Sequence, residues 1–374
     1  MKILYLAPGA IPSSSANSVH VAHMAGALAS LGHDVTVLAP AKKPWGLTSG
    51  ETAAKLYGVP RGFRLLHAPK PKIPSRSFIY SLALRIILRF IKPDLVYSRQ
   101  LLGAYTASKR GYRTVFELHE PVWERQRARG RKWFAYLTQA PSVQGFVCIS
   151  KALGDYLNRT FPESSGRTLV LPDAAPHWPS RPQRSRNRKF TVGYFGSFYA
   201  GKGLETILSV APLCPWASFL VVGGTRDQFK KYTADSRSPN NVIFRERREH
   251  ALVQQMMSEC DVLVAPYLEE VRTYGGGKDV SQWMSPLKIF EYMSARRPII
   301  CSDLPVLREI LQDEVNALLV PPGDIEGWRS AITRLKENRA LGQNLANRAR
   351  RDFDGTHTWF RRVERVLDWF ENAN

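Results

Sequence analysis

The chain has 374 residues, 44% of them hydrophobic, which suits roughly two to three globular domains and excludes a disordered chain. Lysine and arginine total 53 against 32 aspartate and glutamate, and the resulting net charge of +21 favours anionic partners. No apolar stretch is long enough to span a bilayer, and the opening apolar run is too short for a signal peptide, so we expect a cytoplasmic protein.

The four cysteines give no sign of a disulfide framework or a metal site. None forms a Cys-x-x-Cys pair, and none has a histidine at metal-ligand spacing. We therefore expect reduced core thiols at Cys148, Cys214, Cys260 and Cys301.

The first part of the chain, residues 1–178, alternates strand-like and helix-like segments. The apolar run at 2–8, the helical spacing from Val19 to Leu31 and the apolar run at 35–40 predict a β-α-β unit with parallel strands. Further strands are expected at FRLLHA, DLVYSR, RTVFELH, GFVCIS and TLVLPD.

A polar, basic segment without apolar periodicity, PSRPQRSRNRK at 179–189, is the best candidate for a linker. The alternation then starts again over 190–355, with strands expected at FTVGYFG, SFLVVGG, NVIFRE, VLVAPY, PIICSD and NALLVPP. Two α/β domains with parallel sheets imply a central cleft, because ligands bind outside the carboxyl ends of such strands.

Residues 356–374 predict one amphipathic helix that has no strand of its own and must pack on a domain already built. We group this segment with residues 1–178. Its apolar face is expected to hold Trp359, Val363, Val366, Leu367 and Phe370.

The strongest chemical signal starts at Ser285 and Pro286, which precede a helix and then an apolar strand. Proline suits the first turn of a helix, and the free amides of that turn favour a phosphate. Glu291 follows about a turn and a half later, where its carboxylate can accept hydrogen bonds from a ribose diol. The alternative is a surface glutamate on a packing helix.

Four segments together resemble the family-four glycosyltransferases of the GT-B fold, in that family's order and spacing. They are residues 1–40, GYFGSFYAGKGLETIL at 193–208, SPLKIFEYMSARRPIICSD at 285–303 and NALLVPPGD at 316–324. The resemblance implies an α/β fold of two Rossmann-like domains whose parallel sheets face a central cleft, with the C-terminal helix crossing back to the first domain. It also implies a hexosyltransferase-type enzyme that uses a nucleotide-sugar and retains the anomeric configuration.

Carried over residue by residue, the resemblance places the donor in the second domain. Glu291 would hold the donor ribose. The family's first glutamate, which contacts the transferred sugar, is replaced by Trp283, so recognition of the sugar ring must differ. The diphosphate would meet the short run of Ser285, Pro286, Leu287 and Lys288.

The loop after the strand at 190–195 carries Lys202, which matches the family's phosphate-binding lysine and would stabilise the leaving diphosphate. Gly196 would let the backbone approach the donor, whereas Ser197 stands where the family often has an arginine. Arg245 lies where the base-contacting loop begins. No metal-binding Asp-x-Asp site stands out, so cationic side chains would replace a divalent ion, and we expect no metal and no cofactor.

In the first domain, His119 ends a strand and resembles the family's active-site histidine, which lies near the acceptor and the transferred sugar. The alternative is a structural histidine. With Lys202 and Glu291, it completes the catalytic candidates.

Two loops are weaker candidates for contacts with the donor. Gly9, Asn17 and Ser18 belong to the loop after the first strand, where the family usually has a double glycine. Gly276 and Gly277 lie in a glycine-rich segment that either cradles phosphate, acts as a flap or binds nothing.

Two basic segments bear on the acceptor. Residues 76–92 are apolar with Arg85, Arg89 and Lys92 at near-helical spacing, which is typical either of a helix lying on an anionic membrane or of a core-packing helix. The segment 125–133 is a basic patch that suits a lipid-linked phosphate, an anionic glycan or only solvent. We expect a glycan or lipid-linked acceptor in cell-surface polysaccharide or glycolipid synthesis, with an anionic membrane as a further partner.

Other classes of protein stay open as alternatives. An epimerase or phosphorylase can use the same fold, and the charge alone would suit a polyanion- or nucleic-acid-binding protein. No RRM, zinc-finger or basic-zipper signature is present, so nucleic acid is not an expected partner. Neither half carries Gly-x-Gly-x-x-Gly after its first strand, which argues against a dinucleotide-dependent oxidoreductase.

Overall fold

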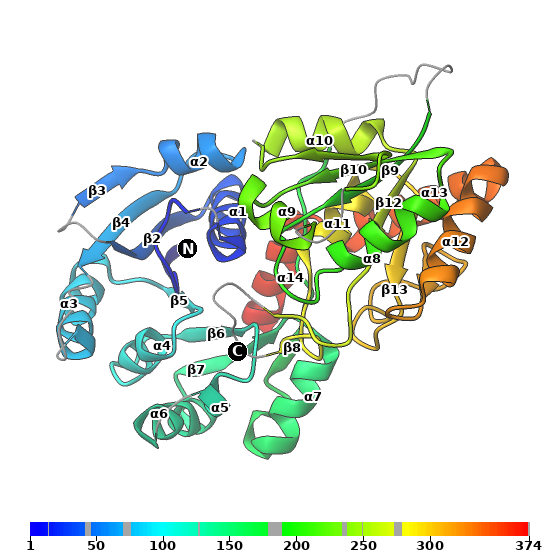
Figure 1. Cartoon of the computed structure of the whole chain (residues 1–374). Coiled ribbons are helices and arrows are strands. Elements are labelled where there is room, and N and C mark those ends of the chain that lie inside the picture. The colour runs from blue at the N-terminus through cyan, green and yellow to red at the C-terminus, as the bar shows by residue number, and fades with distance from the viewer. Residues whose placement is uncertain are drawn as a thin grey trace. The chain divides into compact units, whose positions relative to one another are not determined.

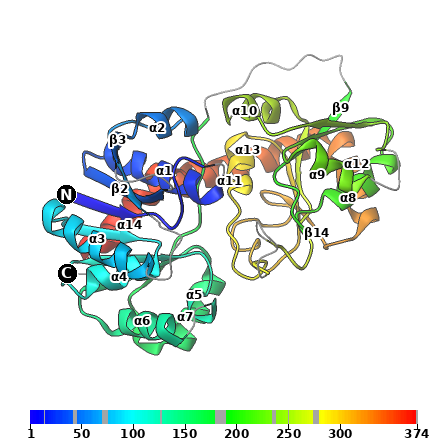
Figure 2. The same cartoon turned by 60° about the vertical axis from the view of Figure 1, so that its left-hand side comes forward.

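The chain forms two compact units, each built on its own sheet (Figure 1, Figure 2). The first unit comprises Met1–Asp173 with Trp359–Asn374, and the second comprises Ala174–Thr358. Of the linker expected at 179–189, only Lys189 lies within the described residues. The computed structural model describes residues 1–13, 15–41, 46–69, 76–125, 128–178, 189–233, 238–248, 250–272 and 279–372.

The first unit contains an eight-stranded sheet in the order β3-β4-β2-β1-β5-β6-β7-β8. Neighbouring strands are parallel except β3, which pairs antiparallel with β4. The parallel strands match the predicted apolar runs, whereas β3 has too little apolar character to give a strand signal. The strands are β1 (Lys2–Leu6), β2 (Asp34–Ala41), β3 (Gly46–Ser49), β4 (Arg64–Pro69), β5 (Leu95–Ser98), β6 (Thr114–Leu118), β7 (Val143–Cys148) and β8 (Thr168–Val170).

The first helix of this unit starts earlier than its apolar periodicity predicts. Ser15 caps the helix, because its side chain accepts a hydrogen bond from the amide of Ser18 at 3.3 Å. The helices of the unit are α1 (Ala16–Ser30), α2 (Glu51–Tyr57), α3 (Arg76–Ile91), α4 (Leu101–Ser108), α5 (Val122–Arg125), α6 (Ala128–Gln139), α7 (Lys151–Thr160) and α14 (Trp359–Asn372), with the short 3-10 helix η1 (Pro162–Ser164).

Helix α14 is the C-terminal helix that the sequence predicts, and it packs against α1 in the first unit (Figure 1). Arg362 is buried on this helix as well, although it is charged. The predicted apolar face is confirmed, because its five members are all buried: Trp359, Val363, Val366, Leu367 and Phe370.

The second unit contains a six-stranded parallel sheet in the order β11-β10-β9-β12-β13-β14. Its strands coincide with the predicted apolar runs. They are β9 (Phe190–Phe195), β10 (Ala217–Val222), β11 (Val242–Arg245), β12 (Val262–Ala265), β13 (Ile299–Ser302) and β14 (Leu318–Val320). The helices are α8 (Leu204–Val210), α9 (Arg226–Tyr232), α10 (His250–Glu259), α11 (Leu287–Ser294), α12 (Ile325–Glu337) and α13 (Arg339–Thr356), with the 3-10 helix η2 (Ala211–Leu213).

Strand β12 shows why the strands of this sheet read as continuous apolar runs. It sends Val262 and Val264 into one core cluster, and Leu263 and Ala265 into another. Successive side chains of a strand point to opposite faces, so both faces of this sheet are covered.

The cysteine prediction is confirmed, since all four are buried and unbridged. No helix in the described part of the chain is long and apolar enough to cross a membrane.

Two phenylalanines on α14 test its placement in the first unit. Phe370 is 1% exposed and Phe360 is 43% exposed. Phe370→Ala should lower the free energy of unfolding of the first unit by about 3 kcal/mol, because it leaves a cavity in a packed core. Phe360→Ala, the matched control, should change it by less than about 0.5 kcal/mol. Urea denaturation followed by circular dichroism measures both, and equal effects would contradict this placement.

Candidate active site

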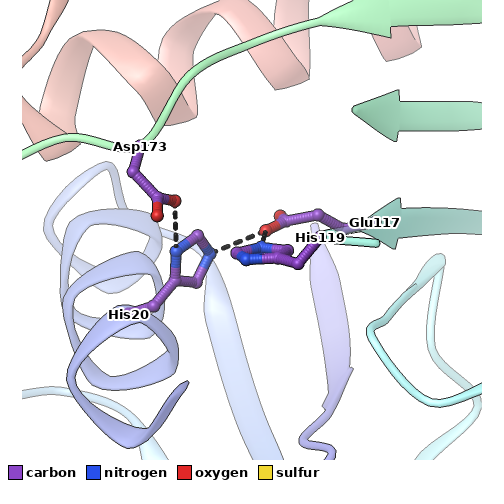
Figure 3. Close-up of side chains that lie close together, drawn as sticks. All are labelled: His20, Glu117, His119 and Asp173. Carbon is purple, nitrogen blue, oxygen red and sulfur yellow. Dashed lines mark hydrogen bonds and ion pairs between the residues drawn. The ribbon is translucent and has the colours of Figure 1, made fainter. Parts of the chain in front are cut away.

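Four ionisable side chains of the first unit converge at the carboxyl ends of its strands (Figure 3). His20 comes from α1, Glu117 lies in β6, His119 follows β6, and Asp173 follows β8. His20 bridges the two carboxylates, with Nδ1 2.8 Å from Asp173 Oδ1 and Nε2 2.8 Å from Glu117 Oε1. His119 Nε2 lies 2.5 Å from the same Glu117 oxygen. We call these four residues the histidine–carboxylate cluster.

Three more side chains contact Glu117, which is fully buried. The Tyr97 hydroxyl donates to Oε2, Arg362 Nη1 lies 3.3 Å from Oε2, and Arg99 Nε lies 3.7 Å from Oε1. Arg362 also donates from Nε to the carbonyl of Pro172 at 2.9 Å. The cluster therefore depends on α14, the element that supplies Arg362.

The two carboxylates of the cluster are ionised at neutral pH. Burial alone would raise the pKa of Glu117, but Arg362, His20 and the hydrogen bond from His119 outweigh burial and hold the pKa well below its usual range. Burial would also raise the pKa of Asp173, and the contact with His20 lowers it instead. Unpaired, such charges would be costly to bury, which explains why the sequence surrounds them with cations.

His119 is the cluster member that reaches solvent, with 24% of its side chain exposed. Burial and the nearby Arg99 lower its pKa to about 4, although the hydrogen bond to Glu117 acts in the opposite direction. The ring is therefore neutral at physiological pH. Because Nε2–H donates to the carboxylate, this tautomer leaves Nδ1 as an acceptor for a hydroxyl group.

Two histidines and two carboxylates with ligand atoms within 4.8 Å of one another also match the composition of a metal site. The charges around them argue for an ion-pair network. Two guanidiniums, Arg362 and Arg99, already offset the two carboxylates, and both ring nitrogens of His20 face carboxylates. A divalent cation would therefore gain little net attraction here.

Of the three contact residues predicted after β1, Gly9 lies in the loop, whereas Asn17 and Ser18 belong to the first turn of α1. Asn17 Oδ1 accepts a hydrogen bond from Arg99 Nη2 at 2.7 Å. The Ser18 hydroxyl donates to the carbonyl of Ala10 at 2.8 Å and so holds the loop together. A Cβ added at Gly9 would meet nothing within 4 Å, so the loop has room for a larger residue there.

Most of the cluster was not predicted from the sequence. Glu117 stands inside an apolar strand, and Asp173 ends the apolar run 168–173; each is a carboxylate at the carboxyl end of a predicted parallel strand. Their position at these strand ends could have marked both residues as candidate site residues. His20 and Arg362 gave no such signal, because each lies on a helix whose packing partners become known only in the folded chain.

In the second unit, two lysines share one aromatic ring. Lys202 lies in the loop after β9, and Lys288 is the second residue of α11. Their Nζ atoms lie 5.1 Å and 4.3 Å from the centroid of the Tyr267 ring, and Lys288 Nζ lies 4.8 Å from that of Tyr194. Lys288 Nζ is buried and has no hydrogen-bond partner in the part of the chain that the structure describes. We call Lys202 and Lys288 the lysine pair.

Two glycines bring the Lys202 loop against the chain that follows β12. Gly201 and Gly203 have φ of +78° and +82°, and an added Cβ would lie 1.8 Å from the carbonyl oxygen of Glu270 or 1.7 Å from that of Pro266. A side chain at either position would push the loop outward. The glycines therefore fix the position of Lys202 beside Tyr267.

The lysine pair is electrostatically strained. Burial lowers the pKa of Lys202 to about 8. Burial, and then repulsion from Lys202, lower the pKa of Lys288 to about 7. A dianionic ligand would stabilise both ammonium groups, which makes a diphosphate a suitable occupant.

Other predicted donor residues lie around the pair. A Cβ added at Gly196 would lie 3.7 Å from Lys288 Nζ, an ordinary contact distance, so the backbone of Gly196 passes close to the ammonium. Helix α11 begins at Leu287, and Pro286 before it makes no side-chain capping bond. The charge of Glu291 acts on Lys288 against the effect of burial. The helix start thus adds outward-pointing amides to the two cations.

The remaining candidates are less closely tied to the pair. The carbonyl of Ser197 accepts a hydrogen bond from a tyrosine hydroxyl at 3.2 Å, and Ser285 is buried. Arg245 is exposed at the end of the edge strand β11. Gly276 and Gly277 lie outside the described residues.

The neutral His119 should make the protein acid-sensitive. Its pKa falls from an ordinary 6.5 to about 4 on folding, so between these values the unfolded chain binds a proton that the folded chain lacks. Stability should fall by about 2 kcal/mol as the pH drops through this window, allowing for partial exposure. His119→Gln keeps a donor for Glu117 and should remove that part of the fall. Urea denaturation across this pH window measures the free energy of unfolding of both proteins. If His119→Gln loses as much stability as the wild type, His119 does not have the lowered pKa described here.

Each of the two units matches a known protein family. Residues 18–174 match the family described as Glycosyltransferase Family 4, and residues 189–338 match the one described as Glycosyl transferases group 1. Together the two matches cover most of the chain.

Individual relatives agree with these families. A glycogen synthase of Mycobacterium tuberculosis is 22% identical over 379 residues, covering 91% of this chain and 87% of the relative. O-antigen chain mannosyltransferase C of Escherichia coli is 22% identical over 270 residues, covering 70% of this chain and 68% of the relative. The crystal structure of Anabaena Alr3699/HepE in complex with UDP has the same fold, with a TM-score of 0.72 at 15% identity over the full length of both chains.

The two family matches and the two parallel sheets lead to one conclusion: the chain belongs to glycosyltransferase family 4 and is a GT-B enzyme that uses a nucleotide-sugar donor.

Proposed function

We propose that the lysine pair binds the diphosphate of the nucleotide-sugar, and that the enzyme transfers the sugar to a glycan or lipid-linked acceptor with retention of configuration. The carrying observation is the buried Lys288 ammonium, which lies beside a second cation without a hydrogen-bond partner among the described residues. Burying two like charges together is unfavourable unless an anion joins them.

The proposed chemistry follows from where charge develops. Cleavage of the bond between the sugar and the diphosphate leaves negative charge on the departing phosphate. Lys202 and Lys288 would stabilise that charge together with the first amides of α11, without a divalent ion. Glu291 would accept hydrogen bonds from the donor ribose. Retention is the usual outcome in family 4 and is part of this proposal.

The histidine–carboxylate cluster would serve the sugar side of the reaction. His119 is neutral and offers Nδ1 as an acceptor, so it would take a hydrogen bond from a sugar hydroxyl rather than act as a cation. Glu117 would hold the ring in that tautomer.

The acceptor is proposed to belong to cell-surface polysaccharide or glycolipid synthesis. The relative in Escherichia coli is an O-antigen chain mannosyltransferase, and the net charge of +21 suits a phosphate-bearing or otherwise anionic acceptor. We place the enzyme in the cytoplasm, associated with an anionic membrane surface.

Nucleotide binding tests the lysine pair directly. UDP or GDP at about 100 times its Kd should stabilise the folded protein by about 2.7 kcal/mol, with or without EDTA, because it binds only the folded state. Lys288→Met and Lys202→Met should each weaken binding roughly thirtyfold, as expected for loss of a charged contact worth about 2 kcal/mol. The control is Lys336→Met, since this exposed lysine of the same unit also lies over an aromatic ring, at 4.1 Å from Trp216. Thermal shift and titration calorimetry measure all three variants. Wild-type affinity in both pair variants would refute the site.

Proton uptake on nucleotide binding is a second test. The pKa of Lys288 is about 7 before binding, and a bound diphosphate should raise it. Affinity should therefore be greatest below that value and fall as the pH rises above it, and binding near pH 8 should take up part of a proton. Calorimetry in buffers of different ionisation enthalpy measures this uptake, which Lys288→Met should reduce to the smaller share of Lys202, whose pKa is about 8. If the wild type takes up no proton on binding, the pKa of Lys288 is not lowered as described here.

A further inference from the structure

Helix α3 covers the first sheet with one face and leaves a large apolar surface on the other. Its inner face belongs to a core cluster through Tyr80, Leu84, Ile87 and Leu88. Its outer face carries four large apolar side chains, which we call the α3 stripe: Phe78, Leu82, Ile86 and Phe90, exposed to 70%, 48%, 51% and 81%.

The stripe is a continuous feature of the surface. Its members recur every fourth residue, so they follow one another along the outer side of the helix. Four of the ten exposed large hydrophobic side chains in the described ranges lie on this one helix, and Phe78 and Phe90 are the most exposed of all. Single exposed hydrophobic residues are ordinary, whereas such a row marks an interaction surface.

Polar contacts hold α3 in this orientation. The hydroxyls of Ser81 and Thr106 lie 3.1 Å apart and join α3 to α4, and the Tyr112 hydroxyl donates to the carbonyl of Leu88 at 2.9 Å. The inner face is thus fixed to the unit, and the stripe points outward as a consequence of packing.

Positive charge accompanies the stripe. Arg85 and Arg89 are exposed on the same helix, Lys92 is exposed directly after its last residue, and residues 78–92 contain no aspartate or glutamate. On an α-helix, positions 85 and 89 lie along one border of the stripe, between its axis and the core face.

The charge continues over the neighbouring helices. Figures 1 and 2 show α3, α4 and α6 in a row, and α4 packs against both of the others. Residues 101–113 and 128–140, which contain α4 and α6, also lack any aspartate or glutamate. Lys109 and Arg110 follow the last residue of α4, and α6 carries Arg129, Arg131 and Lys132.

We propose that the α3 stripe inserts into the interface of an anionic lipid bilayer, while the basic residues of α3 and α6, and those directly after α4, contact the lipid headgroups. An apolar stripe bordered by arginines suits this surface, because the hydrocarbon boundary takes the side chains and the anionic headgroups attract the cations. A second copy of the chain is a poor occupant, since it would bring its own arginines and a further +21 of charge to the same face. The proposal concerns a surface distinct from the donor site and does not depend on nucleotide binding.

Vesicle binding by the whole protein tests this surface. The protein is mixed with phosphatidylcholine vesicles, or with vesicles that also contain phosphatidylglycerol, and the bound fraction is measured by flotation. The wild type should bind the anionic vesicles at least tenfold more strongly. Phe78→Ser with Phe90→Ser, and separately Arg85→Glu with Arg89→Glu, should each reduce that binding at least tenfold. Added salt should weaken binding, because it screens the headgroup attraction.

A matched control separates the stripe from exposed apolar surface in general. Leu252→Ser with Phe360→Ser changes two side chains that are each 43% exposed and lie outside α3, and it should bind vesicles like the wild type. Thermal unfolding and the nucleotide-induced shift check that every variant is folded, so a failure of this proposal is distinguishable from a failure of the donor site. The proposal is overturned if the Phe78 and Phe90 variant binds anionic vesicles like the wild type. It is also overturned if vesicle charge makes no difference, or if light scattering shows a dimer that this variant abolishes.

Discussion

The buried carboxylate of Glu117 is the constraint on which the first unit depends. It is buried near the carboxyl end of β6, where an uncompensated charge would cost several kcal/mol. Its compensation comes from three distant parts of the sequence: His20 on the first helix, Arg99 after β5, and Arg362 on α14. One charge therefore ties the first helix, the centre of the sheet and the last helix together, and it does so where His119 meets solvent.

The two units differ in how their buried charges are balanced. In the first, carboxylates and guanidiniums offset one another, and the product of that balance is a neutral imidazole with a defined tautomer. In the second, two ammonium groups are gathered without an equivalent counter-charge among the described contacts, and both are held below their ordinary pKa values. The charges around the histidine–carboxylate cluster are balanced within the protein. The lysine pair, by contrast, is suited to a ligand that brings negative charge.

Much of the fold was predictable from the sequence, because parallel strands covered on both faces read as apolar runs between helical segments. The resemblance at 285–303 and 193–208 also pointed to Lys202 and Lys288, whose closeness the structure shows. The antiparallel β3 gave no signal, since its four residues include too few apolar side chains. Most of the histidine–carboxylate cluster was missed for a different reason. Its members are far apart in sequence, and the partners of ionisable residues such as His20 and Arg362 are known only in the folded chain.

The origin of Arg362 in α14 has a consequence for the order of assembly during translation. Residues 174–358, which make up the whole second unit, have to be synthesised before Arg362 leaves the ribosome. Until then the nascent first unit carries Glu117 without one of its cations and lacks the apolar face of α14 over α1. Domains are generally completed from the N-terminus onward during synthesis, but here the later domain can mature first. Every chain in which Arg362 has reached Glu117 therefore already contains Lys202 and Lys288.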